Sequence, residues 1–160
     1  MSDTLPLSNA APGFICDVQL GKLARRLRLL GFDTIYRNVL EDEEIIRIAR
    51  TDQRTILTRD GEILSNKTTR SYRPDSIFSD EQVREVLSVF NLRGQIRPSS
   101  LCIKCNGEII PVDKDSVIVL VSPRSGQFME HFWRCQGCRK IYWQGSHYEK
   151  LRKWFGDVLK

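Results

Sequence analysis

The sequence predicts an α/β domain, with a parallel sheet flanked by helices, followed by a small module that a metal ion holds together. Two observations carry this prediction. Short apolar runs alternate with amphipathic segments over residues 14–90, which is the pattern of strand–helix–strand units. Four cysteines then follow in two Cys-x-x-Cys pairs, a spacing that suits one tetrahedral metal ion.

The first strands and helices follow from the apolar periodicity. Residues 14–16 are expected to form a short buried strand. Residues 19–30 carry leucines on one helical face, and Gly31 is expected to close that helix. A second strand is expected over residues 32–36. Asp42 then opens a second helix, whose first turn is acidic as the helix dipole favours.

The next elements continue the alternation. Residues 55–58 are expected to form a third strand, residues 65–74 a polar loop, and residues 76–78 a fourth short strand. Ser79 begins a segment with capping-box spacing ahead of a further helix. Alternating strands and helices predict a parallel sheet, in which ligands bind at the carboxyl ends of the strands.

Glycine and proline in residues 93–98 mark a linker between the α/β domain and the cysteine-containing module. In that module, strands are expected over residues 109–112, 117–121 and 132–134. Because 29 residues separate the two cysteine pairs, the chain between them should form a long hairpin. A last helix is expected from about residue 146.

The expected organisation is a disordered N-terminus over residues 1–12, a core domain over residues 13–97, and the cysteine-containing module with its C-terminal helix over residues 98–160. No apolar run is long enough to cross a bilayer, and no targeting segment is recognised, so we expect a soluble protein without a membrane partner. The pairing of cysteines in metal spacing fits a reducing compartment, and we expect a cytoplasmic location. The fifth cysteine, Cys16, lies in an apolar run and is expected to be a buried, inert thiol.

Cys102, Cys105, Cys135 and Cys138 are the expected zinc ligands. Each two-residue spacer lets a turn direct both sulfurs at one ion, and a closed shell of four thiolates is typical of structural zinc. The alternative, four unrelated buried cysteines, requires two such pairs to arise by chance. We therefore expect a zinc ribbon whose metal supports the fold and does not run a reaction.

Positive charge is concentrated in the cysteine-containing module. Residues 1–98 hold 15 Lys and Arg against 14 Asp and Glu, whereas residues 99–160 hold 10 against 6. Aromatic residues such as Trp133, Tyr142 and Trp143 lie among these cations and are suited to stacking on unpaired bases, although half or more should fill the small core of the ribbon. This module therefore has the charge expected for binding a polyanion such as nucleic acid.

Three aspartates are expected at one rim of the parallel sheet. Asp17 and Asp60 stand at or just past the ends of predicted strands, and Asp42 stands at the start of a helix. Clustered carboxylates repel one another, and such a cluster usually holds a divalent cation, Mg²⁺ or Mn²⁺. The alternative is that Asp42 is only a helix cap and that the other two are ordinary surface residues.

The chain resembles a known family in core and ribbon alike. The segments that carry the resemblance are residues 14–17 (FICD), 21–28 (GKLARRLR), 31–34 (GFDT), 42–45 (DEEI), 57–60 (LTRD), 102–107 (CIKCNG), 132–138 (FWRCQGC) and 142–147 (YWQGSH). They are similar to the PIN-like ribonuclease family named after the C-terminal domain of the Mut-seven exonuclease, whose members carry a zinc ribbon after a PIN-like core. The resemblance spans about residues 14–150.

The resemblance implies a metal-dependent ribonuclease with its catalytic residues at Asp17, Asp42 and Asp60. PIN domains commonly use a fourth acid, for which Glu43 is our first choice and Glu62 the second. Thr58 resembles the hydroxyl residue that PIN proteins place beside the metal or phosphate.

Basic residues on the first helix are candidates for RNA binding. Lys22, Arg25 and Arg26 lie within about 100° of one another on the face opposite the leucines, and could contact phosphates without reading sequence. The alternative is an ordinary solvated helix face. His131 and His147 are not expected to bind metal, because four cysteines already satisfy zinc.

The sequence therefore favours a ribonuclease that hydrolyses RNA phosphodiester bonds with Mg²⁺ or Mn²⁺ and that carries structural Zn²⁺. A competing hypothesis is a non-catalytic RNA-binding or ribosome-associated module. A toxin-like PIN protein is a third possibility, against which the ribbon weighs.

Overall fold

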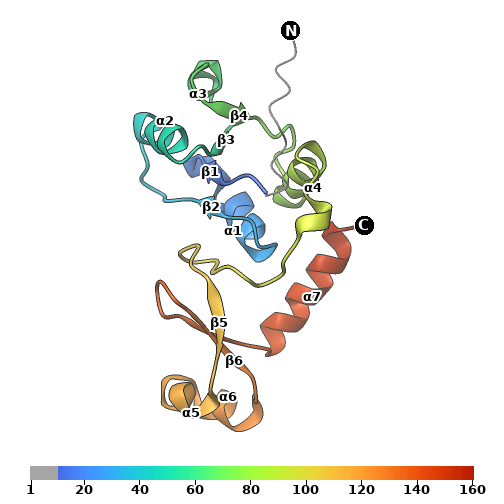
Figure 1. The fold of residues 1–160 in the computed structure, drawn as a ribbon. Helices are drawn as coiled ribbons and strands as arrows, with labels where there is room; N and C mark the ends of the chain where they lie inside the picture. The colour runs from blue at the N-terminus through green and yellow to red at the C-terminus, as the bar shows by residue number, and fades with distance from the viewer. Residues whose placement is uncertain (1–10) are drawn as a thin grey trace.

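The computed structural model describes residues 11–160, which form two sheets joined by a linker (Figure 1). The expected disorder over residues 1–12 lies outside the described residues, apart from residues 11 and 12. The chain is mixed α/β, as the sequence predicts, with the zinc-ribbon cysteines in the second part.

The first sheet has four parallel strands in the order β2-β1-β3-β4. They are β1 (Phe14–Cys16), β2 (Thr34–Ile35), β3 (Thr55–Leu57) and β4 (Arg70–Tyr72). Residues 14 and 15 of β1 pair with residues 34 and 35 of β2 on one side, and with 55 and 56 of β3 on the other. The predicted parallel sheet is confirmed.

The fourth strand was placed wrongly by the sequence pattern. β4 lies inside the segment expected to be a loop, whereas residues 76–78 form only a bend ahead of the next helix. The edge strand β4 is polar and partly exposed, so it carries no apolar signal. Ile77 and Phe78 supplied the misleading signal, and their side chains are 73% and 63% exposed.

Helices cover both faces of this sheet because consecutive residues of a strand point to opposite sides. Phe14 and Cys16 pack in one apolar cluster with residues of α1 (Gly21–Leu29) and α4 (Ser79–Val89). Ile15 and Ile56 pack in a second cluster with α2 (Asp42–Thr51) and the short helix α3 (Gly61–Ser65). The result is a three-layer core with the sheet in the middle.

The predicted first helix, residues 19–30, is divided in two. A 3-10 turn, η1 (Val18–Leu20), precedes α1. At its end, Gly31 adopts φ +88°, the N–H of Phe32 donates to the carbonyl of Leu27 at 3.0 Å, and the N–H of Gly31 donates to that of Arg28 at 3.0 Å. This is a Schellman motif, so the expected glycine stop is confirmed. Ser79, by contrast, is the first residue of α4, and the N-cap position falls on Phe78, which makes no capping hydrogen bond with its side chain.

The second sheet is antiparallel, in the order β5-β6-β7, and forms the ribbon. Its strands are β5 (Ile109–Val112), β6 (Phe132–Cys135) and β7 (Ile141–Trp143). The expected strand over residues 117–121 is wrong: residues 117–120 lie in α5 (Lys114–Val117) and the 3-10 turn η3 (Ile118–Leu120), before α6 (Pro123–Phe128). The run lies at the tip of the β5–β6 hairpin, beyond the last paired residues, Val112 and Phe132. The expected long hairpin is present, with a helical tip (Figure 1).

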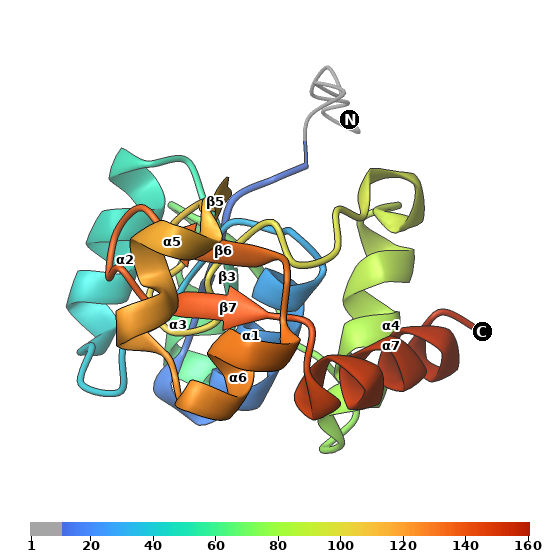
Figure 2. The same ribbon diagram turned by 90° about the horizontal axis from the view of Figure 1, so that it is seen from below.

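The last helix, α7 (Ser146–Val158), begins where the sequence predicts and returns to the first domain, where it packs beside α4 (Figures 1 and 2). Trp154 anchors it. Its indole N–H donates to Asp80 of α4 at 2.8 Å, and the guanidinium of Arg26 lies 4.4 Å from the centre of its ring. Arg26 also forms an ion pair with Asp80 at 3.5 Å. Val158 is buried in the same apolar cluster as Phe14.

Arg28 of α1 joins the core to the ribbon. Its side chain is buried, and its guanidinium donates to the carbonyls of Thr34 at 2.9 Å, Ile103 at 2.9 Å and Tyr36 at 3.5 Å. Ile103 lies between the first two cysteines. One side chain therefore holds the end of β2 and the first cysteine turn against α1.

A second contact reinforces this junction. The amide of Asn106 donates to Asp33 at 2.6 Å and accepts from the N–H of Thr34 at 3.0 Å. Asp33 also forms an ion pair with Arg54 at 2.8 Å. Burial raises the pKa of Asp33, but the hydrogen bonds from Arg54 and Asn106 outweigh it and hold that pKa below its ordinary value.

Replacement of Arg28 by lysine should destabilise the protein, because an ammonium cannot reach three carbonyls that a planar guanidinium satisfies together. The substitution would leave some of these carbonyl oxygens unpaired. We therefore expect Arg28→Lys to lower the free energy of unfolding by roughly 2–3 kcal/mol in urea titrations. Arg25→Lys is the matched control, since Arg25 is exposed on the same helix, and it should leave stability unchanged. Equal stability of the two variants would contradict the role given to Arg28.

Candidate functional site

The four cysteines lie on two backbone turns of the same geometry. In the first turn, the N–H of Asn106 donates to the carbonyl of Cys102 at 2.8 Å, and the N–H of Cys102 donates to that of Gly107 at 2.8 Å. In the second turn, the N–H of Arg139 donates to Cys135 at 3.1 Å, and the N–H of Cys135 donates to Lys140 at 2.9 Å. Asn106 and Arg139 both have positive φ, +69° and +66°. The two Cys-x-x-Cys pairs therefore form equivalent turns that face each other.

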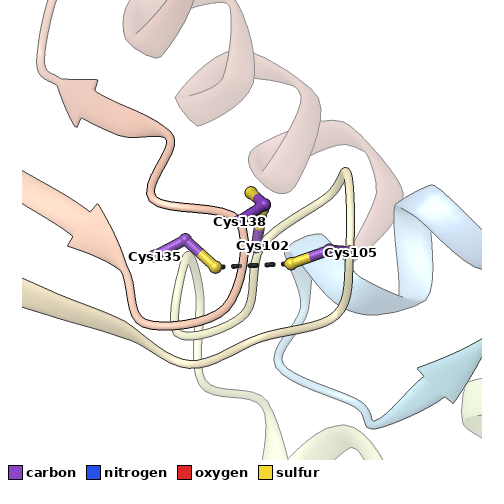
Figure 3. A group of neighbouring side chains, drawn as sticks. All are labelled: Cys102, Cys105, Cys135 and Cys138. Atoms are coloured by element: carbon purple, nitrogen blue, oxygen red, sulfur yellow. Dashed lines mark hydrogen bonds between the residues drawn. The ribbon is translucent and has the colours of Figure 1, made fainter.

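The sulfurs of these turns converge (Figure 3). Cys105 and Cys135 Sγ are 3.4 Å apart, Cys102 and Cys138 Sγ are 3.6 Å apart, and all four lie within 4.8 Å of one another. With metal–sulfur bonds of about 2.3 Å, four sulfurs in this arrangement surround a position that suits Zn²⁺. The four cysteines could hold a zinc ion, as the sequence predicts, and neither His131 nor His147 belongs to the group.

Two glycines leave room for the sulfurs. A Cβ on Gly107 would lie 2.8 Å from Cys135 Sγ and 3.2 Å from Cys105 Sγ, and a Cβ on Gly137 would lie 3.2 Å from Cys105 Sγ. Real Cβ atoms do not approach other atoms to 2.8 Å. A side chain at position 107 would therefore push the two turns apart.

The surroundings make the cysteines unequal as acids. Burial raises the pKa of Cys105, but the backbone N–H of Gly107 and the Cys135 thiol outweigh it and lower that pKa to about 7. Burial raises the pKa of Cys135 to about 11. Burial also raises the pKa of Cys102, but a hydrogen bond with the hydroxyl of Tyr142, at 2.9 Å, and backbone N–H groups outweigh it. The cysteines would not all ionise at neutral pH unaided, so metal binding must release protons.

The second group of candidate residues lies at the carboxyl ends of β1 and β3. Asp17 directly follows β1 and is only 4% exposed. The hydroxyl of Thr58 donates to Asp17 Oδ2 at 3.0 Å and accepts from the N–H of Asp60 at 2.9 Å. Asp60 Oδ1 caps α3, accepting from the N–H groups of Glu62 at 2.7 Å and Ile63 at 3.3 Å. Thr58 thus ties two of the predicted aspartates together.

Asp42, in the first turn of α2, interacts electrostatically with the other acids. Burial raises its pKa, and the negative charges of Asp60, Asp17 and Glu62 raise it further. Glu43 is exposed and is not among the charges with the largest effect on Asp42. We name Asp17, Asp42, Asp60 and Glu62 the carboxylate rim.

No residue of the carboxylate rim forms an ion pair with a basic side chain described in residues 11–160. In the described part of the chain, only the four cysteines form a set of three or more candidate ligands whose donor atoms all lie within 4.8 Å of one another. The donor atoms of the carboxylate rim are therefore farther apart than those of the cysteines. A cation at the rim would therefore keep several waters, as Mg²⁺ does when it is bound by one or two carboxylates.

The basic residues expected to bind RNA divide into two kinds. Lys22 and Arg25 are exposed on α1, whereas Arg26 is engaged by Asp80 and Trp154. Sequence reasoning missed the structural roles of Arg28 and Tyr142, for which a single chain carries no distinguishing signal. It also missed α3, although Asp60 followed by Gly61 and Glu62 is a capping pattern that could have revealed it.

Comparisons with known proteins identify one family. The Mut7-C RNAse domain matches residues 12–155 of this chain. A search of the curated proteins and a search of the solved structures found no match. Among the helices described in residues 11–160, none is both long and apolar enough to cross a membrane.

Replacement of Gly107 by alanine should weaken zinc binding, because the added Cβ would lie within 2.8 Å of the sulfur of Cys135. We expect wild-type protein to hold one zinc per chain, and Gly107→Ala to bind it at least about tenfold more weakly in competition with a chromogenic chelator. Gly94→Ala is the control, since a Cβ there meets nothing within 4 Å. Identical competition curves for the two variants would argue against the sulfur geometry described above.

Proposed function

This chain belongs to the Mut7-C RNAse domain family, and on that premise we propose that it hydrolyses RNA phosphodiester bonds with a divalent metal ion held at the carboxylate rim. Family membership supports nuclease activity and RNA as the class of substrate. The metal dependence and the residues that provide it are the further steps of the proposal.

The observation that carries the proposal is the environment of Asp17. The residue is 4% exposed, it lies near the charges of Asp42 and Asp60, and no basic side chain described in the structure pairs with it. A buried carboxylate beside other carboxylates costs free energy unless a cation compensates it. Oxygen ligands of this kind suit Mg²⁺ or Mn²⁺.

Three residues of the rim have assigned parts in the proposed reaction. Asp17 and Asp60 would hold the ion, and Thr58 fixes the carboxylate of Asp17 through its hydroxyl. Asp42 would orient the attacking water and accept its proton. When bound, the ion would stabilise negative charge on the phosphate and lower the pKa of the attacking water.

The fourth acid of the proposal is Glu62. It lies two residues after Asp60, its charge acts on Asp42, and its backbone N–H donates to Asp60. Glu43, the first choice from the sequence, adjoins Asp42 and remains the alternative. The cytoplasmic location and the domain boundary between residues 97 and 98 also remain predictions.

A non-catalytic RNA-binding module is the second candidate function. The observation that favours it is the distance between the carboxylates of the rim, whose oxygen atoms do not lie as close together as the four sulfurs do. On this alternative, the carboxylates would not be needed for any effect of the protein on RNA.

The two candidates are separated by cleavage of end-labelled single-stranded and structured RNAs with added Mg²⁺ or Mn²⁺. We expect Asp17→Asn and Asp60→Asn each to lower the cleavage rate about a hundredfold or more, because a neutral amide oxygen binds a divalent cation more weakly than a charged carboxylate does. Asparagine still caps a helix, so Asp60→Asn should keep α3 intact.

Asp115→Asn is the matched control, because Asp115 is exposed on α5, and it should cleave like the wild type. Glu62→Gln should lose more activity than Glu43→Gln. Cleavage that survives both Asp17→Asn and Asp60→Asn would rule out the carboxylate rim as the catalytic centre. Divalent cations are best withheld by omission, because a strong chelator would also remove zinc.

A further inference from the structure

A basic groove lies between the core and the ribbon. It has a volume of about 470 Å³, five of the eight residues that line it are arginine or lysine, and none is acidic. The residues that carry the argument are Arg25, Arg28, Tyr36, Arg37, Lys104 and Lys140. We name this feature the junction groove.

The cations of the junction groove come from separate parts of the chain. Arg25 lies on α1, Arg37 on the loop between β2 and α2, and Lys104 and Lys140 on the first and second cysteine turns. The fold therefore brings like charges together at a place where core and ribbon meet. Like charges repel, so such a concentration favours an anionic ligand.

These cations are available to a ligand. Arg25, Arg37 and Lys104 are exposed and, among the residues that the structure describes, form no ion pair. Lys140 is exposed and lies 5.3 Å from the ring centre of Tyr142, which fixes its position beside the groove. Arg28 is different, because its donors already bind the carbonyls that join core and ribbon.

Tyr36 places the junction groove at the edge of the sheet that carries the carboxylate rim, because it follows β2 as Asp17 follows the parallel strand β1. The hydroxyl of Tyr36 donates to the carbonyl of Val18 at 3.2 Å, next to Asp17. Its ring packs so closely on Gly21 that a Cβ there would lie 2.5 Å from the hydroxyl oxygen. The next two residues in the chain, Arg37 and Asn38, also line the groove, and they lie in the loop that leads to Asp42. The groove and the acids therefore lie at the same edge of the sheet.

We infer that the junction groove binds the phosphate backbone of a single RNA strand that runs from the zinc ribbon toward the carboxylate rim. Its cations would contact successive phosphates and give affinity without reading the bases. The ribbon then supplies part of the substrate site and not only support for the core. The inference rests on the proposed function in taking RNA as the ligand, and not on cleavage.

Binding can be measured without catalysis, by fluorescence anisotropy of a fluorescein-labelled oligouridylate with no added divalent cation. We expect Arg25→Gln/Arg37→Gln and Lys104→Gln/Lys140→Gln each to weaken binding roughly tenfold at moderate salt. The slope of log affinity against log salt should become shallower by about 0.7 for each charge removed from a single-strand site.

Lys150→Gln/Lys153→Gln is the matched control, because it removes two exposed charges from α7 that do not line the groove. It should bind like the wild type. The Arg25/Arg37 variant leaves the cysteine turns unchanged, so weaker binding by it cannot come from loss of zinc. For the Lys104/Lys140 variant, a measurement of zinc content checks that the cysteine turns still hold the metal.

Equal affinity of wild type and both groove variants would overturn the inference, even if the protein cleaves RNA. Loss of binding only in the control pair would also overturn it. Weakened binding in both groove variants would support it, even if no cleavage is found, so the outcome is distinct from that of the cleavage experiment.

Discussion

The guanidinium of Arg28 is the contact on which the arrangement of the two parts depends. It is buried, and it gives one hydrogen bond each to the first residue of β2, the residue that follows this strand, and the first cysteine turn. Burial of a charged group costs free energy unless its donors are hydrogen-bonded. The stability of the core therefore depends on the three carbonyls that accept hydrogen bonds from Arg28. The same contact holds the first cysteine turn beside α1, and Arg28 lines the junction groove.

Zinc and the core are linked through that contact. Ile103, whose carbonyl accepts from Arg28, lies within the first cysteine turn, and Asn106 of the same turn binds Asp33 and Thr34. A zinc ion on the four cysteines would hold the sulfurs of this turn together with those of the second turn. Loss of zinc would therefore disturb the docking of the ribbon as well as its local fold. The metal would act on the proposed reaction only through structure.

The sequence was sufficient for features that depend on local chemistry. The parallel sheet, the glycine stop at Gly31, the start of α2 at Asp42 and the gathering of the four cysteines all follow from spacing or periodicity. It failed where tertiary context decides: β4 is polar because it lies at an edge, and residues 117–121 are apolar yet lie at a hairpin tip. The grouping of Arg37, Lys104 and Lys140 depends on docking between distant segments, which a single sequence does not reveal.

Binding of Mn²⁺ followed by electron paramagnetic resonance tests the proposed centre most directly, because it does not require the right RNA to be known. The carboxylates of Asp17 and Asp60 should make the wild-type protein bind Mn²⁺, while zinc remains on the cysteines. The Asp17→Asn/Asp60→Asn variant should lose that binding and keep its zinc and its fold. Equal Mn²⁺ binding by the folded variant and the wild type would contradict a divalent metal centre at the carboxylate rim.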